Sequence, residues 1–151
     1  MTFSLRHAAL VLALALASGL AAAQAASPAG LWKTVDDNTK KEKSLVRIVE
    51  SGGVYTGKVE KIIDPDSPKD AVCKDCTDDR KDKPVVGMTI IRNMKASGDK
   101  DVFEGGDILD PNNGKVYSAK LTLVDGGKKL DVRGYIGMPM LGRTQTWQRV
   151  E

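Results

Sequence analysis

Short apolar segments separated by turn residues run through the chain and constrain its fold more than any other feature. The segments are rich in β-branched residues and end in turn signals such as Ser51-Gly52-Gly53, Asp64-Pro65 and Asn113-Gly114. Asn-Gly between two such segments is a strong hairpin signal, and turns that recur at this spacing are typical of antiparallel all-β folds. We predict no helix after residue 25 and eight strands, over residues 31–35, 44–50, 54–63, 85–94, 101–109, 115–124, 129–137 and 143–150.

Alternation along the predicted strands gives them one apolar face each. Two such faces are clear: Tyr117, Ala119, Leu121 and Leu123 on one strand, and Leu130, Val132, Gly134 and Ile136 on the next. Closing the sheet removes exposed edges, and eight strands enclose either a packed core or one small ligand. We therefore expect a single antiparallel up-and-down β-barrel, with an open sandwich as the alternative.

The first 25 residues have the order of a secretory signal peptide. Arg6 precedes an apolar run over residues 8–17, and Ala23-Gln24-Ala25 fits the A-x-A cleavage rule. The apolar run is too short for a permanent membrane anchor. We expect cleavage after Ala25, no membrane span, and a periplasmic or secreted bacterial protein with one domain over residues 26–151.

Charge and histidine content exclude several classes of function. Residues 26–151 hold 22 of the 23 basic residues and all 20 acidic ones, a net charge of +2 with both signs interspersed. This balance argues against a nucleic-acid partner. The one histidine, His7, lies in the signal peptide, so the mature chain lacks Ser-His-Asp or Cys-His catalysis and His-ligated metal. We expect no enzyme activity, no cofactor and no metal.

Cys73 and Cys76 lie in a charged loop, DAVCKDCTDDRKDK, at residues 70–83. An oxidising compartment favours a local structural disulfide between them. A redox-active pair is one alternative, although aspartates flank the cysteines and oppose a stabilised thiolate. A metal site is the other, although two thiolates supply only half of a zinc site. A disulfide closing so short a loop contributes about 2 kcal/mol and shapes the loop more than it holds the barrel.

Both ends of the predicted barrel resemble known proteins. Gly30-Leu31-Trp32 opens the first strand and GRTQTWQRV, residues 142–150, forms the last. A Gly-x-Trp with a late arginine resembles the lipocalin-like (calycin) barrels, in which the pair plugs one barrel end through a cation–π contact. The resemblance implies Trp32 as the plug, with Arg143 or Arg149 as its partner.

A wider pattern covers nearly the whole mature chain. GLWK, the Cys-x-x-Cys loop, GGDILDPNNGKVYSAKL and LDVRGYIGMPMLGRTQTWQR occur in this order. The pattern is similar to the bacterial exported family catalogued as domain of unknown function 2147. That resemblance implies an exported lipocalin-like barrel and brings no catalytic residues.

Side chains on the expected inner faces are candidates for a ligand site. Arg92 shares parity with Met88 and Ile90, so it is either a pocket anchor or a strand-end side chain that reaches water. Methionines between the last two strands form either an apolar lip at the barrel mouth or a plain packed turn. We expect a small apolar or amphipathic ligand, with candidate residues Arg92, Tyr117, Leu121, Val132, Ile136, Met138 and Met140. The alternatives are a filled barrel that acts as a structural or envelope-stress interaction protein, and a thiol–disulfide protein.

Overall fold

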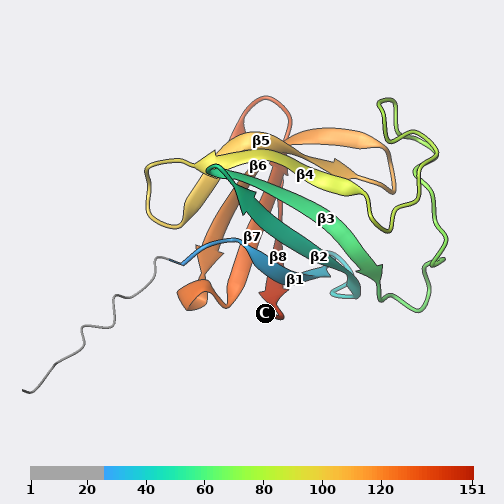
Figure 1. Ribbon diagram of the computed structural model, residues 1–151, viewed down its shortest axis with the longest axis horizontal. Coiled ribbons are helices and arrows are strands. Elements are labelled where there is room, and N and C mark those ends of the chain that lie inside the picture. The colour runs from blue at the N-terminus through green and yellow to red at the C-terminus, as the bar shows by residue number, and fades with distance from the viewer. Residues whose placement is uncertain (1–25) are drawn as a thin grey trace, which may run out of the picture.

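Eight antiparallel strands close into one barrel in the computed structural model, which describes residues 26–151 (Figure 1). The predicted signal peptide lies outside the described residues. Each strand pairs with the next along the chain and β8 returns to β1. The up-and-down barrel is therefore confirmed and the open sandwich is wrong. The strands are β1 Gly30–Val35, β2 Glu42–Ser51, β3 Val54–Ile62, β4 Thr89–Ala96, β5 Val102–Asp110, β6 Lys115–Val124, β7 Lys129–Tyr135 and β8 Arg143–Arg149.

Helical structure in residues 26–151 is limited to two 3₁₀ turns, η1 Asp125–Gly127 and η2 Pro139–Leu141. In this part of the chain, no helix has the length and hydropathy needed to cross a membrane. The prediction that no α-helix follows residue 25 is confirmed.

Alternating residues of neighbouring strands meet in the barrel core. Leu121 of β6 pairs with Val132 of β7, and Leu123 pairs with Leu130. All four side chains are buried, as the predicted apolar faces require. Removing a side chain of this size from water stabilises the fold by about 1.5–3 kcal/mol.

The two ends of the barrel differ in the connections they carry. The β2–β3, β4–β5 and β6–β7 turns lie at the end where β1 begins, which we call the closed end. The β1–β2, β3–β4, β5–β6 and β7–β8 connections lie at the opposite end, which we call the open end. The open end therefore carries the longer and more irregular segments of the chain.

Trp32 and Arg149 fill the closed end. Trp32 is fully buried, and the Arg149 guanidinium carbon lies 4.3 Å from the centroid of its ring. The guanidinium also donates hydrogen bonds to the carbonyl oxygens of Ser27 (2.6 Å), Ala29 (2.9 Å) and Gly127 (2.7 Å). The arginine thus joins the segment before β1 to the β6–β7 turn, and the tryptophan's partner is Arg149 rather than Arg143.

A long connection between β3 and β4, residues 63–88, lies at the open end (Figure 1). It contains the predicted disulfide. Cys73 and Cys76 are bonded to each other and almost fully buried, so the disulfide is confirmed. The Cys73 sulfur lies 3.6 Å from the Pro111 carbonyl oxygen in the β5–β6 turn. A side chain at Gly114 would lie 2.0 Å from the Asp75 carbonyl oxygen, so glycine allows this turn and the loop to pack together.

The predicted strand over residues 85–94 begins later, at Thr89. The Val85 amide instead donates to the Ala71 carbonyl within the long connection, and Gly87 has a φ of 89°. Asn93 also has a positive φ, of 60°, and the β3–β4 register shifts on either side of Gly57. Strict alternation of faces therefore fails along this strand.

Candidate functional site

The open end of the barrel leads into a cavity of about 410 Å³. Its apolar wall includes Ile90, Ile108, Val132 and Trp147, which come from β4, β5, β7 and β8. The volume is within the range of sites that hold small molecules. An eight-strand barrel has room for one such molecule when its core does not fill it.

Gly134 of β7 contributes to the width of the cavity. A side chain added there would meet the Cβ atom of Tyr117 at 3.4 Å and the Cγ2 atom of Ile108 at 3.6 Å. Because glycine has no side chain, the space between these two residues stays open. Tyr117 itself lines the cavity, and its hydroxyl accepts a hydrogen bond from the Asn113 side chain at 3.2 Å.

Gln145 supplies a polar group inside the apolar wall. The Trp147 indole N–H donates to the Gln145 Oε1 atom at 3.0 Å, and the tryptophan is 2 % exposed. Since the Oε1 atom accepts from the indole, the Gln145 amide nitrogen is the group that remains to bind a ligand. Among the described residues this nitrogen has no hydrogen-bond partner, so it presents N–H donors within a residue that lines the cavity.

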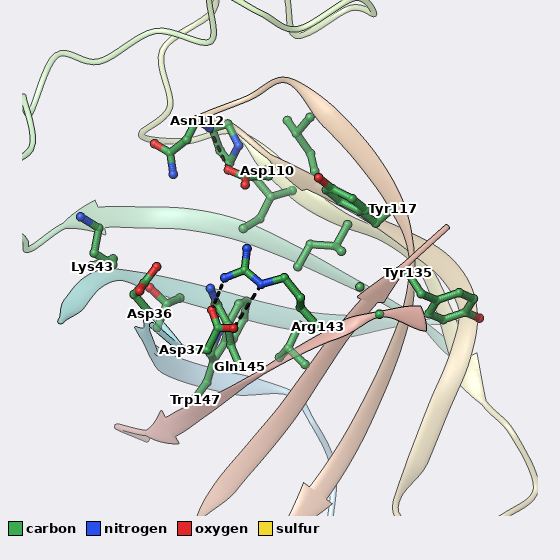
Figure 2. Close-up of a pocket in the computed structure, with 18 of the residues that line it drawn as sticks. Asp36, Asp37, Lys43, Asp110, Asn112, Tyr117, Tyr135, Arg143, Gln145 and Trp147 are labelled. Atoms are coloured by element: carbon green, nitrogen blue, oxygen red, sulfur yellow. Dashed lines mark hydrogen bonds and ion pairs between the residues drawn. The ribbon is translucent and has the colours of Figure 1, made fainter. Parts of the chain in front are cut away.

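An ion pair between Asp37 and Arg143 crosses the mouth of the cavity (Figure 2). Asp37 lies in the β1–β2 turn and Arg143 begins β8. The Arg143 Nη2 atom lies 2.6 Å from Oδ1 of Asp37, and its Nε atom lies 3.2 Å from Oδ2. Hydrogen bonding from Arg143 lowers the pKa of Asp37, and the carboxylate raises the pKa of Arg143, so both groups are charged at neutral pH.

Two further carboxylates, Asp36 and Asp110, border the same mouth. The Asp36 Oδ1 atom accepts from the Thr39 amide at 2.7 Å, and this bond is the main cause that lowers the pKa of Asp36. The Asp110 Oδ1 atom accepts from the Asn112 amide at 2.9 Å. Within residues 26–151, the second oxygen of each carboxylate has no hydrogen-bond partner, and Figure 2 shows both residues near the Arg143 guanidinium.

Lys43, at the start of β2, is the other cation of the lining. Its ammonium group forms an ion pair with Asp64, whose side chain is 2 % exposed. Asp64 also accepts a hydrogen bond from the Ser67 hydroxyl at 3.0 Å. The lysine holds the pKa of Asp64 well below its usual range, so the charge of Lys43 is neutralised at the cavity wall.

Three of the predicted ligand-binding residues, Tyr117, Val132 and Ile136, line this cavity. Leu121 does not line it, because its side chain is fully buried in the packed core. Strand parity alone places a residue on the inner face, and it does not say at what depth the core ends.

Arg92 lies outside the cavity, which corrects its prediction as the pocket anchor. Its guanidinium reaches Asp79 in the long connection, with 3.2 Å between Nη2 and Oδ2. Together with Arg80 and Met88 it borders a separate surface depression. The loop carboxylate gives the guanidinium a partner near solvent, which avoids the cost of a buried unpaired charge.

Met138 and Met140 also lie outside the lining, with 55 % and 72 % of their surface exposed. The η2 turn is closed by a hydrogen bond from the Leu141 amide to the Met138 carbonyl at 3.0 Å. This turn leaves Leu141, rather than either methionine, in the lining of the cavity.

The sequence prediction missed the charged mouth. Its residues come from the β1–β2 turn, the start of β2, the end of β5 and the start of β8. One signal was present: the segment Asp36-Asp37-Asn38-Thr39 follows the first strand, and side chains of this kind form turns by bonding their own backbone. The sequence makes Arg143 a candidate for the barrel plug, whereas the structure places it at the mouth. In the described part of the chain, no group of three or more His, Cys, Asp or Glu side chains is placed to hold a metal ion.

Comparisons with known proteins agree with the fold. A family model described as "Uncharacterized protein conserved in bacteria (DUF2147)" matches residues 30–149. A solved structure described as "Protein HP1028 from the human pathogen Helicobacter pylori belongs to the lipocalin family" matches with a TM-score of 0.71. The two chains are 20 % identical, and the match covers 83 % of this chain and 84 % of the other. The search of curated proteins found no match.

Proposed function

The chain belongs to the DUF2147 family of bacterial proteins, and we propose that it binds one small amphipathic molecule in the cavity at the open end of its lipocalin-like barrel. The observation that carries the proposal is the cavity of about 410 Å³, with an apolar wall and a polar mouth. An alkyl or ring portion would lie against Val132 and Trp147. The polar end would stay at the mouth, where charged side chains and water meet it.

The cavity favours binding over a purely structural role. A barrel that serves only as a scaffold gains stability by filling its interior, because an unfilled apolar space loses packing contacts. Here the closed end is filled by Trp32, while the open end keeps Gly134 where a larger residue would close the gap. An open apolar space that leads to a polar rim is the usual form of a small-molecule site.

The buried disulfide counts against the thiol–disulfide alternative. Cys73 and Cys76 are 0 % and 1 % exposed. Exchange requires an attacking thiolate to reach one of the two sulfur atoms. Burial of both sulfurs supports a structural role, and we therefore propose a binding protein rather than an enzyme.

Export is part of the same proposal. The A-x-A site before Ala26 and the disulfide both suit a protein that is processed into an oxidising compartment. N-terminal sequencing of the protein recovered from the periplasm should begin at Ala26. Recovery of the same protein from the cytoplasm with Met1 intact would contradict export.

A fluorescent probe tests the binding proposal. N-phenyl-1-naphthylamine is neutral and brightens in apolar surroundings, so it should bind with saturable fluorescence. Val132→Trp places an indole in the cavity and should abolish the signal, whereas Val116→Trp, at a 44 %-exposed position on β6, should not. Circular dichroism checks that both variants fold. Equal binding by the two variants would show that the probe does not use the cavity.

A further inference from the structure

We infer that the cavity selects amphipathic molecules whose polar end is positively charged, such as an alkylammonium, over carboxylates of the same chain length. This inference rests on the proposed function. It follows from the placement of Asp36, Asp37 and Asp110 around the Arg143 guanidinium (Figure 2). It also reverses the prediction that a cationic anchor in the barrel meets an anionic ligand.

The mouth holds more negative than positive charge. Its cations are Lys43 and Arg143, and each is paired: Lys43 with Asp64 and Arg143 with Asp37. Asp36 and Asp110 then remain as two carboxylates that form no ion pair with any cation of the described residues. The net charge around the mouth is therefore negative.

A carboxylate ligand would meet an arginine that is already paired with Asp37, beside two more carboxylates. Arg143 binds carboxylates most strongly when two of its N–H groups act together. The N–H of Nε and one N–H of Nη2 already donate to Asp37. The remaining N–H groups of Nη1 and Nη2 belong to a guanidinium whose charge Asp37 already neutralises. The anion would also approach Asp36 and Asp110, whose charges repel it.

An ammonium group would meet acceptors instead. Asp36 and Asp110 each have one oxygen to which no described side chain or backbone group donates a hydrogen bond. The negative charges of both carboxylates also raise the pKa of Arg143. Two unit charges 4–5 Å apart in a water-like medium attract by an amount that corresponds to about fourfold in affinity. The two carboxylates together should therefore favour a cation over a neutral group by roughly tenfold.

Three probes with one chain length test this inference: decylammonium, decanol and decanoate, each titrated calorimetrically below its micelle concentration or solubility limit. We expect affinity to fall in that order and the differences to shrink as salt is added. The double variant Asp36→Asn/Asp110→Asn keeps the amide-accepting oxygens of both turns and should remove about tenfold of the preference for the cation. Asp99→Asn, at an exposed position in the β4–β5 turn at the closed end, is the matched control and should change nothing.

The outcomes separate the two proposals. Binding of none of the three probes would contradict the proposed function itself. Binding of all three with equal affinity, or with decanoate tightest, would overturn the charge selectivity and leave the binding function standing. A preference for the cation that survives the double variant would place its origin outside Asp36 and Asp110, and would also overturn the inference.

Discussion

The Arg149 guanidinium lies 4.3 Å from the centroid of the fully buried Trp32 ring. The contact closes the barrel at the end opposite the cavity. Trp32→Ala should cost about 3–5 kcal/mol of unfolding free energy, because it leaves a large void in the core. Arg149→Ala should cost less, and the effects of the two changes should not add, because both remove the same contact. Urea denaturation of the two single variants and the double variant measures this coupling.

Arg143 offers the control for that cycle. It lies at the open end, and its side chain is 66 % exposed. Arg143→Ala should therefore combine additively with Trp32→Ala. If the losses of Trp32→Ala and Arg149→Ala also sum without coupling, the stacked pair does not hold the closed end together.

The ion pair between Lys43 and Asp64 predicts a dependence of stability on pH. Asp64 has a lowered pKa in the folded protein, so its side chain stays ionised to a lower pH there than in the unfolded chain. The stability it contributes is fully present above its ordinary pKa, near 4, and is lost as the pH falls through the lower folded value. Asp64→Asn should thus destabilise the protein at pH 7, and the difference from the unmodified protein should shrink below about pH 4.

Asp66→Asn is the matched control for this titration. Asp66 pairs with Lys41, but its side chain is 71 % exposed, and exposed pairs contribute little. Thermal melts from pH 7 down to pH 2 should show a pH-dependent effect for Asp64→Asn and almost none for Asp66→Asn. A constant effect of Asp64→Asn across this range would contradict the role of its charge.

Replacement of Cys73 and Cys76 by serine tests the structural role of the disulfide. The bridge closes a loop with a sequence separation of 3, so its loss should lower the unfolding free energy by about 2 kcal/mol in the chain-entropy model. The far-ultraviolet circular dichroism of the barrel should persist, because the disulfide lies in the β3–β4 connection and not in a strand. Catalysis of insulin reduction by the unmodified protein would contradict this role.

The fold could be predicted from the sequence because its signals are local. Alternation in residues 115–124 and 129–137 fixed the inner faces, and the turn residues fixed where strands end. The plug could be predicted from the resemblance to lipocalin-like barrels, which leaves two candidates, Arg143 and Arg149, for the partner of Trp32. Closure of the barrel places β8 beside β1 with Trp32 opposite Arg149. The sequence alone does not determine the register between these two strands, so it cannot distinguish Arg149 from Arg143.

The mouth of the cavity could not be predicted because its groups meet only after closure. Asp37 and Arg143 are 106 residues apart. The prediction for Arg92 is wrong because it assumes unbroken alternation, whereas the consecutive residues Ile90 and Ile91 are both buried and Asp79 supplies a partner from the long connection. Parity along one strand cannot reveal a counter-charge that arrives from a loop.

The affinity of a series of linear alcohols, from butanol to decanol, tests the central claim of an apolar ligand cavity most directly. Each methylene that enters the cavity should add about 0.8 kcal/mol, or about fourfold in affinity, until the cavity is full. Isothermal titration should show this graded rise in the unmodified protein and in Val116→Trp, and its loss in Val132→Trp. Affinity that does not depend on chain length, or a rise of the same size in Val132→Trp, would contradict the claim that the barrel interior binds the ligand.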